Sequence, residues 1–322
     1  LIDAVEQNSD TGYITGLVLK SGERIEGDLF IDCTGFRALL IDKTLETGFT
    51  DWSHWLPTDR AIAVQTEATG PALPYTRAIA HDSGWRWKIP LQHRVGNGLV
   101  YSSAHLSDED AQARLLAEID GAPLTEPRII RYRTGRREKV WVKNCISIGL
   151  SSGFVEPLES TSIHLIQIYA SRLVQMFPFH GFSEALATRY NDLARVELER
   201  IRDFIILHYK LTERSDSAFW RTMGAMDIPD SLRNRIALFR DTGLAYQEKA
   251  ELFQVDSWLQ VMMGQRLHPL GRHHLGRLMS ADQMKMALNG LRTNIDKAVA
   301  SMPTHQDFLD QYMREPELAA KA

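Results

Sequence analysis

Residues 147–162, SIGLSSGFVEPLESTS, decide how the chain is organised, because they join a short apolar strand to a largely helical region. The small residues after the strand let the backbone approach another group closely. Pro157 stiffens the turn, and Ser160 or Thr161 can cap the helix that follows. A helix start carries unpaired amides and a positive dipole, so this one is suited to bind an anion. An ordinary strand–turn–helix corner with a simple cap explains the same residues.

Before this turn the sequence is rich in predicted strands. A short apolar run at residues 29–31 predicts a strand buried on both faces, and it ends in the turn 32–35. In open α/β sheets, ligands bind at the carboxyl ends of the strands. Further on, closely spaced apolar runs separated by turn residues predict an antiparallel sheet that one helix, starting at Ser107, interrupts. Those runs are residues 61–64, 76–80, 85–91, 99–102 and 129–133.

After residue 160 the pattern changes to that of helices. Apolar residues at spacings of three and four predict a long amphipathic helix through Tyr190, Ala194, Leu198, Ile201 and Ile205. A second helix is predicted from the start signal Pro229-Asp230 to Gly243, a residue suited to end it. Strands followed by helices predict a mixed α/β (α+β) fold.

The bulk composition excludes several classes of protein. The 322 residues carry a formal net charge of −4, so there is no strong basic field to bind nucleic acid. No apolar run approaches the ~20 residues that span a bilayer, so no membrane segment is expected. The two cysteines are too few for a disulfide framework, and this number fits a reducing cytoplasm.

Two tryptophans alternate in the stretch Trp85-Arg86-Trp87-Lys88-Ile89-Pro90. In a strand, Trp85 and Trp87 face the same side. Their indole rings can stack on a planar ligand there, or form the wall of a cavity. Packing of both rings into an aromatic core is the alternative interpretation.

These two stretches resemble the signatures of flavin-dependent halogenases. Trp-x-Trp-x-Ile-Pro at residues 85–90 matches the signature by which that family is recognised, and Glu-Pro-Leu-Glu-Ser-Thr at residues 156–161 matches a segment beside its active site. Residues 28–37 resemble the family's strand and turn near the flavin, and residues 208–220 also look familial. The match is closest to the tryptophan-halogenase-like group.

The resemblance implies a flavin monooxygenase-like FAD-binding fold with an antiparallel substrate sheet and a carboxy-terminal helical region. Residues 1–150 would be the remainder of the FAD-binding domain with the inserted sheet, and residues 151–322 the active-site turn and the helical substrate side. It also implies an enzyme that uses FADH2, O2 and chloride or bromide to halogenate an electron-rich aromatic, such as an indole or tryptophan, through hypohalous acid. A separate flavin reductase and a small aromatic substrate would be its partners in the cytoplasm, and a homodimer is left open.

Roles follow from the resemblance residue by residue. Glu159 matches the catalytic glutamate, which would polarise the halogenating species and take the proton lost from the ring, and Ser160 would be an accessory hydrogen bonder. The backbone amides of Thr161 and Ser162 would hold the halide. Flavin-side positions would be Leu150, Gly153, Ile163, Gly35, Trp85 and Trp87.

The chain departs from the family's pattern in two respects. The best-known tryptophan halogenases have glycine where this chain has Ser162, which changes the fit of the halide although a serine amide still binds an anion. The family's catalytic lysine and its Gly-x-Gly-x-x-Gly turn are expected upstream of Leu1, and neither is found in the sequence. We therefore expect the amino-terminal Rossmann part to be absent and the chain by itself to be inactive.

The substrate end of the sequence is less determined. In free-tryptophan enzymes of the family, late helices clamp the amino acid, and the corresponding stretch here is residues 246–264. Phe253 and Trp258 are the candidate substrate contacts, with packing between helices as the alternative. A flavin-dependent monooxygenase on the same fold and a non-catalytic remnant are the alternative functions.

Two charged clusters have simpler explanations. The histidines near residue 270 lie among arginines, which repel a cation, so no metal site is expected. Four arginines at positions 131, 133, 136 and 137 form a basic cluster. They can contact a phosphate of FAD, face acidic residues, or guard a strand edge against aggregation.

Overall fold

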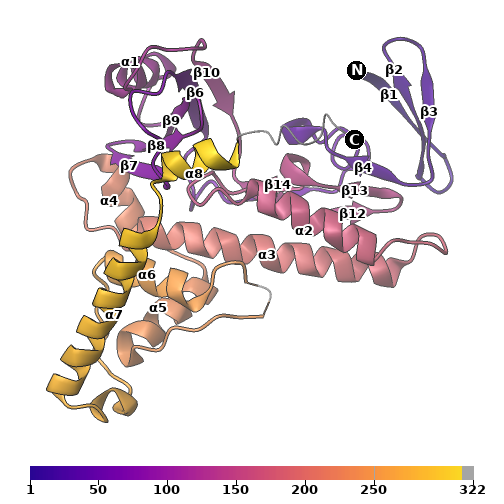
Figure 1. The fold of residues 1–322 in the computed structure, drawn as a ribbon. Helices are drawn as coiled ribbons and strands as arrows, with labels where there is room; N and C mark the ends of the chain where they lie inside the picture. The colour runs from indigo at the N-terminus through magenta and orange to yellow at the C-terminus, as the bar shows by residue number, and fades with distance from the viewer. Residues whose placement is uncertain (250, 314–322) are drawn as a thin grey trace, which may run out of the picture.

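The computed structural model describes residues 1–249 and 251–313, and it has most of its strands in the first half and most of its helices in the second (Figure 1). The last strand, β14 (Gly153–Phe154), lies directly before the Glu156 turn, and the helix α2 (Ser162–Gln175) directly follows that turn. The predicted α/β class, and the change from strands to helices near residue 160, are therefore confirmed.

The antiparallel sheet also forms as predicted. Its strands have the order β10-β6-β9-β8-β7, and every neighbouring pair is antiparallel. They are β6 (Arg60–Thr66), β7 (Arg77–His81), β8 (Gly84–Pro90), β9 (Val95–Tyr101) and β10 (Arg128–Arg131). The helix α1 (Asp108–Glu118) packs on one face, and the Ser107 side chain caps it by accepting the amide of Asp110.

Three smaller sheets make up the other side of the strand region. One contains β1 (Ile2–Gln7), β2 (Ile14–Leu19) and β3 (Arg24–Glu26), and another contains β5 (Phe49–Asp51), β11 (Gly135–Arg137) and β14. In the third, β4 (Phe30–Asp32) pairs in parallel with β13 (Cys145–Ser147), which pairs with β12 (Trp141–Val142). Short 3-10 turns follow β4 and β13, namely η1 (Gly35–Arg37) and η2 (Gly149–Ser151).

The prediction that residues 29–31 form a strand buried on both faces is wrong. Phe30 is buried, but the side chain of Ile31 is 48% exposed. The physical reason is that β4 is the edge strand of a small sheet, and the described residues cover only one of its faces.

The helical region is built around α3 (Glu184–Lys210), which runs below both groups of sheets in Figure 1. The five apolar residues that predicted this helix are all buried. The other helices are α4 (Ala218–Ala225), α5 (Asp230–Thr242), α6 (Val255–Gly264), the short η3 (His274–Arg277), α7 (Ala281–Ser301) and α8 (His305–Tyr312). As predicted, α5 starts after Pro229 and ends at Gly243, which has a left-handed φ of 75°.

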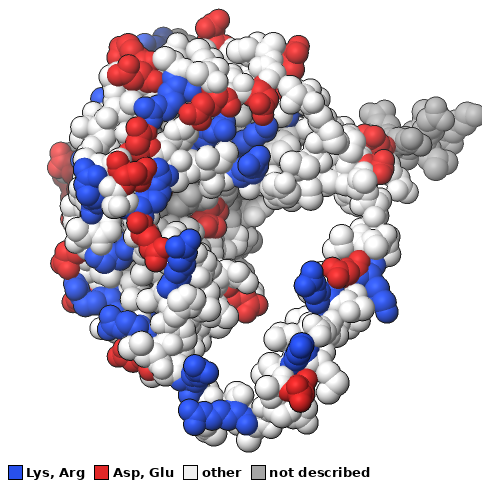
Figure 2. All heavy atoms as spheres, turned by 90° about the vertical axis from the view of Figure 1, so that its left-hand side faces the viewer, with Lys and Arg blue, Asp and Glu red and all other residues white. Residues whose placement is uncertain are grey.

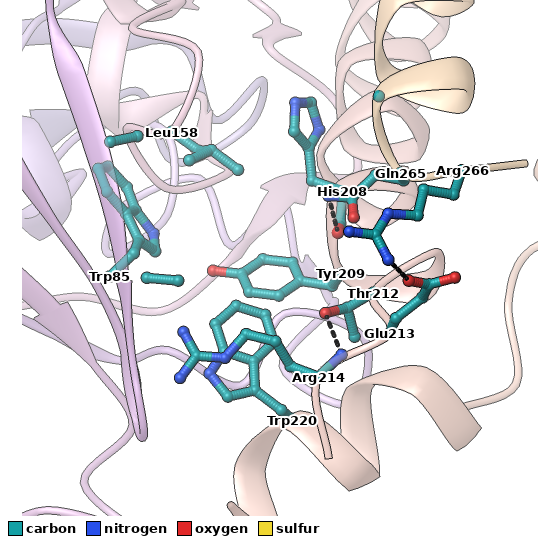
Figure 3. Close-up of a pocket in the computed structure, with 13 residues that line it drawn as sticks. Trp85, Leu158, His208, Tyr209, Thr212, Glu213, Arg214, Trp220, Gln265 and Arg266 are labelled. Carbon is teal, nitrogen blue, oxygen red and sulfur yellow. Dashed lines mark hydrogen bonds and ion pairs between the residues drawn. The ribbon is translucent and has the colours of Figure 1, made fainter. Parts of the chain in front are cut away.

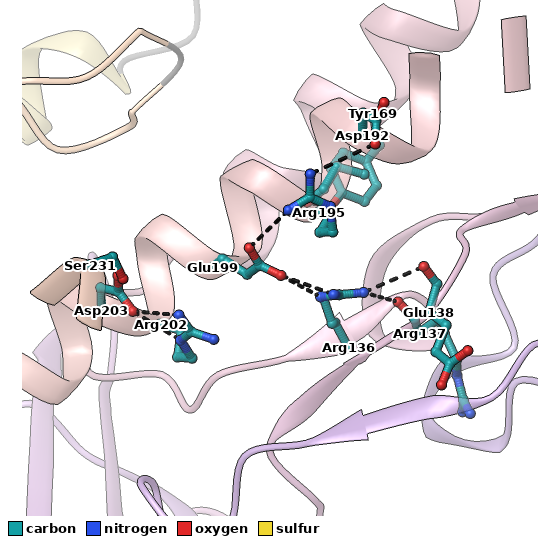
Figure 4. Close-up of polar contacts among 11 residues, drawn as sticks. Arg136, Arg137, Glu138, Tyr169, Asp192, Arg195, Glu199, Arg202, Asp203 and Ser231 are labelled. Atoms are coloured by element: carbon teal, nitrogen blue, oxygen red, sulfur yellow. Dashed lines mark hydrogen bonds and ion pairs between the residues drawn. The ribbon is translucent and has the colours of Figure 1, made fainter. Parts of the chain in front are cut away.

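The main core joins the antiparallel sheet to the helices. Trp85 and Val100 from the sheet pack in one cluster with Ile205 of α3, Phe219 of α4 and Leu232 of α5. Ion pairs add to this packing, because Arg136 of β11 donates to Glu199 of α3 at 2.9 Å (Figure 4).

The basic cluster of four arginines faces acidic residues, as one of its three interpretations predicts. Arg131 pairs with Asp108 and Arg133 with Asp51, while Arg137 pairs with Asp42. Charges of both signs are also interspersed over the face shown in Figure 2. Among the residues that the structure describes, no helix is long and apolar enough to cross a membrane.

Candidate active site

The two signature stretches meet at a cavity of about 550 Å³ between the antiparallel sheet and the helices (Figure 3). Trp85 comes from β8, Leu158 from the turn after β14, Tyr209 from the end of α3, and Trp220 from α4. Three aromatic rings therefore line this space. Such rings present flat apolar faces, which suit a planar aromatic ligand.

Glu159 reaches this cavity through His208, which is one of the residues that line it. The Nε2 atom of His208 lies 2.9 Å from Oε1 of Glu159, and its Nδ1 atom lies 2.8 Å from the carbonyl oxygen of Phe204. Because a carbonyl oxygen only accepts, Nδ1 must carry a hydrogen, and Nε2 carries one only in the charged ring. A hydrogen bond between Nε2 and Oε1 therefore needs a proton on one of these two atoms.

A second carboxylate lies behind the cavity wall. Glu156 is 1% exposed, and its carboxyl group accepts hydrogen bonds from Thr58 at 2.5 Å, from Tyr209 at 2.9 Å and from the indole of Trp85 at 3.3 Å. Burial raises the pKa of Glu156 to about 7, although all three donors act to lower it.

The turn between these two carboxylates is tightly wound. Glu156 and Ser160 have φ angles of 63° and 54°, in the left-handed region that side chains other than glycine rarely adopt. Thr161 occupies the N-cap position of α2, but its side chain makes no capping hydrogen bond. The expectation that Ser160 or Thr161 caps α2 through its side chain is therefore wrong. Among the residues that the structure describes, no side chain caps the first amides of the helix, which start at Ser162.

Of the predicted flavin-side residues, Gly35 and Leu150 lie in the turns after the parallel strands β4 and β13, whereas Trp85 and Trp87 lie on β8 of the antiparallel sheet. The Ser151 hydroxyl donates to the carbonyl oxygen of Asp32 and so ties the two strand ends together. A Cβ atom built on Gly35 would meet nothing within 4 Å, so the backbone faces open space there. Leu150 is half-buried nearby, and Ile163 at the start of α2 is 72% exposed. This open apolar surface beside an uncapped helix start fits a flat ring with an anion next to it.

The two tryptophans of the signature share one side of β8, as predicted, with ring centroids 6.1 Å apart. Trp85 is buried in the main core cluster, and Trp87 packs against the same cluster. Trp85 also lines the cavity, so this side chain belongs both to the core and to the cavity wall. Trp87 lies directly over Gly98 of β9, where a Cβ atom would come within 1.9 Å of the indole ring. Only glycine leaves room for Trp87 in this position.

The two predicted substrate contacts lie away from the cavity. The ring of Phe253 stacks on Phe204 at 3.8 Å, and Trp258 is 1% exposed beneath the guanidinium of Arg235. Neither residue lines the cavity. Their role toward a substrate remains a prediction.

Sequence reasoning assigned no role to several residues that the structure brings together here. His208, Tyr209 and Trp220 fall in the stretch that looks familial, and this was their only signal. Glu156 lies inside the signature motif, but nothing local in the sequence distinguishes it from Glu159. Within residues 1–249 and 251–313, no group of three potential metal ligands comes together.

Comparison with known proteins adds to this geometry. The family model described as tryptophan halogenase matches residues 1–281. The tryptophan 6-halogenase SttH of Streptomyces toxytricini is 42% identical over 233 residues, covering 70% of this chain and 44% of SttH. The tryptophan 7-halogenase RebH of Lentzea aerocolonigenes is 39% identical over 255 residues, covering 77% of this chain and 48% of RebH.

Two solved structures have nearly the same fold. The flavin-dependent halogenase Xcc4156 from Xanthomonas campestris superposes with a TM-score of 0.95 at 48% identity, covering 97% of this chain and 63% of that protein. BrvH, a flavin-dependent halogenase from a Brevundimonas species, gives 0.93 at 46% identity, with coverages of 96% and 63%. The chain thus spans about half the length of the curated relatives and under two thirds of these structures.

Proposed function

The chain belongs to the tryptophan halogenase family, and we propose that it forms the substrate side of a flavin-dependent halogenase that acts on an electron-rich aromatic ring such as an indole. The observation that carries this proposal is the contact between Glu159 and His208 at the wall of an aromatic cavity. A family member that halogenates an arene needs a flat apolar pocket and a base beside it, and the aromatic cavity and Glu159 would supply them.

Different residues of the site would hold the substrate ring and remove its proton. Trp85, Tyr209 and Trp220 hold the substrate ring between apolar faces and keep water away from it. When a halogen replaces a hydrogen on the ring, one proton is released. The carboxylate of Glu159 takes this proton, and His208 moves it away from the ring. Ser160, exposed beside Glu159, assists as a hydrogen bonder.

FAD and a halide ion fit the open surface at the other end of the turn. Gly35, Leu150, Gly153 and Ile163 would contact the flavin ring, and the first amides of α2, at Thr161 and Ser162, would hold the halide. When bound, FADH2 with O2 and the halide supplies the electrophilic halogen. A separate flavin reductase would provide the reduced flavin.

The proposal is tested with the full-length protein, a flavin reductase, O2, bromide and either indole or tryptophan. We expect a product with the bromine isotope doublet in its mass spectrum. An oxygen-added product without the doublet would identify a monooxygenase and overturn the proposal.

The variants Glu159→Gln and His208→Phe test whether these two residues transfer the proton. Each is expected to lower kcat by about 100-fold or more, the usual scale of acid–base catalysis. His105→Phe is the matched control, because His105 also packs edge-on against a phenylalanine, Phe219, but makes no contact with Glu159. Equal loss in His208→Phe and His105→Phe would exclude a catalytic role for His208.

A further inference from the structure

Glu156 connects parts of the active site that are far apart in the sequence. Its carboxyl group receives hydrogen bonds from the loop before β6 through Thr58, from β8 through Trp85, and from α3 through Tyr209. The Glu156 side chain does not line the cavity, but Trp85 and Tyr209 both do. It therefore lies one layer behind the cavity wall and fixes the position of two of its aromatic rings.

The same carboxylate lies close in the chain to both members of the Glu159–His208 pair, either directly or through Tyr209. Glu159 is three residues after Glu156 in one tight turn, and His208 is the residue before Tyr209 on α3. When Glu156 holds Tyr209, it fixes the end of α3 against the turn that carries Glu159. Glu159 and His208, 2.9 Å apart, flank the two residues that this hydrogen bond joins.

The chemistry of the three partners explains why a carboxylate is needed here. The hydroxyls of Thr58 and Tyr209 and the indole N–H of Trp85 all point donors at this group, and they reach both of its oxygens. A carboxylate offers acceptors on both sides, whereas the amide of a glutamine offers an acceptor on one side and donors on the other. A glutamine therefore points its NH2 group at one of these partners, so the hydroxyl of Thr58 or Tyr209 must turn and accept from it instead of donating to residue 156.

We propose that Glu156 is a positioning residue, which holds Trp85 and Tyr209 in the cavity wall and thereby keeps Glu159 in contact with His208. The inference rests on the proposed function, since it concerns the same proton-transfer pair. Glu156 itself does not touch the substrate.

The test compares Glu156→Gln with Glu251→Gln in the full-length protein. Glu251 is the matched control, because its side chain is also buried, at 1% exposure, and its carboxylate binds Arg235 rather than any residue of the cavity. We expect Glu156→Gln to lower kcat for bromination of indole at least tenfold with KM changed less than about twofold, because alignment of the pair matters in the transition state. Glu251→Gln should leave kcat within about twofold of the unsubstituted protein.

A spectroscopic readout separates positioning from a general loss of structure. In protein labelled with 15N-tryptophan, the Trp85 indole N–H signal, assigned with Trp85→Phe, should shift in Glu156→Gln and in Tyr209→Phe but not in Glu251→Gln. An unshifted Trp85 signal, or equal losses of kcat in the two glutamine variants, would overturn the proposal. If Glu156→Gln does not fold, Tyr209→Phe decides: a tenfold lower kcat supports the proposal, and an unchanged one refutes it.

The two proposals fail in different ways. If the unsubstituted protein does not halogenate any aromatic compound, the proposed function is refuted, while the Trp85 signal still reports whether Glu156 holds that ring. If the unsubstituted protein halogenates and Glu156→Gln does so equally well, only the role of Glu156 is refuted.

Discussion

At the scale of single residues, the site contains two glutamates three positions apart with opposite surroundings. Glu156 is buried among three hydrogen-bond donors, whereas the Glu159 side chain is 32% exposed and faces one histidine. The turn that carries them has left-handed φ angles at Glu156 and Ser160, and the two carboxylates meet different partners. The buried one is suited to hold neighbouring groups, and the accessible one is suited to exchange a proton.

The raised pKa of Glu156 predicts how stability depends on pH. Burial raises this pKa from 4.5 to about 7, so the folded protein binds a proton between these values that the unfolded chain has lost. The stability contributed by the protonated form is complete below pH 4.5 and is lost as the pH rises through 7. Relative to Glu156→Gln, the free energy of unfolding should fall by roughly 3 kcal/mol across this window.

Urea unfolding of both proteins at several pH values between 4 and 8 measures this difference. Taking the difference cancels the carboxylates that the two proteins share. If the free energy of unfolding depends on pH in the same way in both proteins, Glu156 ionises as it does in an unfolded chain.

At the scale of elements, a largely buried ion pair joins α2 to α3. Arg172 of α2 donates to Glu197 of α3, and these side chains are only 9% and 12% exposed. The guanidinium also lies 5.5 Å from the ring centroids of Tyr169 and Tyr190. Burial raises the pKa of Glu197, so this carboxylate depends on its partner to remain charged.

Replacing one partner should therefore cost more than replacing both. Arg172→Met is expected to lower the free energy of unfolding by about 3 kcal/mol, because Glu197 is left as a buried charge without a partner. The double variant Arg172→Met with Glu197→Leu should recover to within about 1 kcal/mol of the unsubstituted protein. Denaturant unfolding of the four proteins completes the double-mutant cycle, and additive effects would show that the two residues do not interact.

The sequence predicts those features of the elements that depend on neighbouring residues, and it does not predict those that depend on distant ones. Helix α5 begins and ends where Pro229 and Gly243 predict, because caps and backbone preferences act locally. The exposure of Ile31 and the failure of Thr161 to cap α2 depend on which elements pack beside them, so no local pattern indicates them. The role of Glu156 was unpredictable for the same reason, since its donors are 98, 71 and 53 residues away.

At the scale of the whole molecule, the cavity lies where the antiparallel sheet meets the helical region, and α3 extends from there to the α2 side (Figure 1). One helix stands apart from this arrangement. Figure 2 shows open space between most of the α7 arm and the body, and none of the α7 residues is buried. More than half of the side chain of Leu288, Leu291, Ile295 and Val299 is exposed.

This isolation predicts that α7 contributes little to the stability of the core. Leu291→Glu should leave the Tm within about 1–2 °C of the unsubstituted protein, because glutamate forms helices nearly as well as leucine and no apolar contact is lost. Leu232→Ala in α5, where Leu232 is fully buried, should instead cost about 2–5 kcal/mol. Calorimetry of both variants, with light scattering to record the molecular mass, measures the contrast. If Leu291→Glu lowers the Tm as strongly as Leu232→Ala does, the apolar side of α7 must be covered in solution. If the molecular mass of Leu291→Glu also falls to that of one chain, the cover is a second copy of the protein.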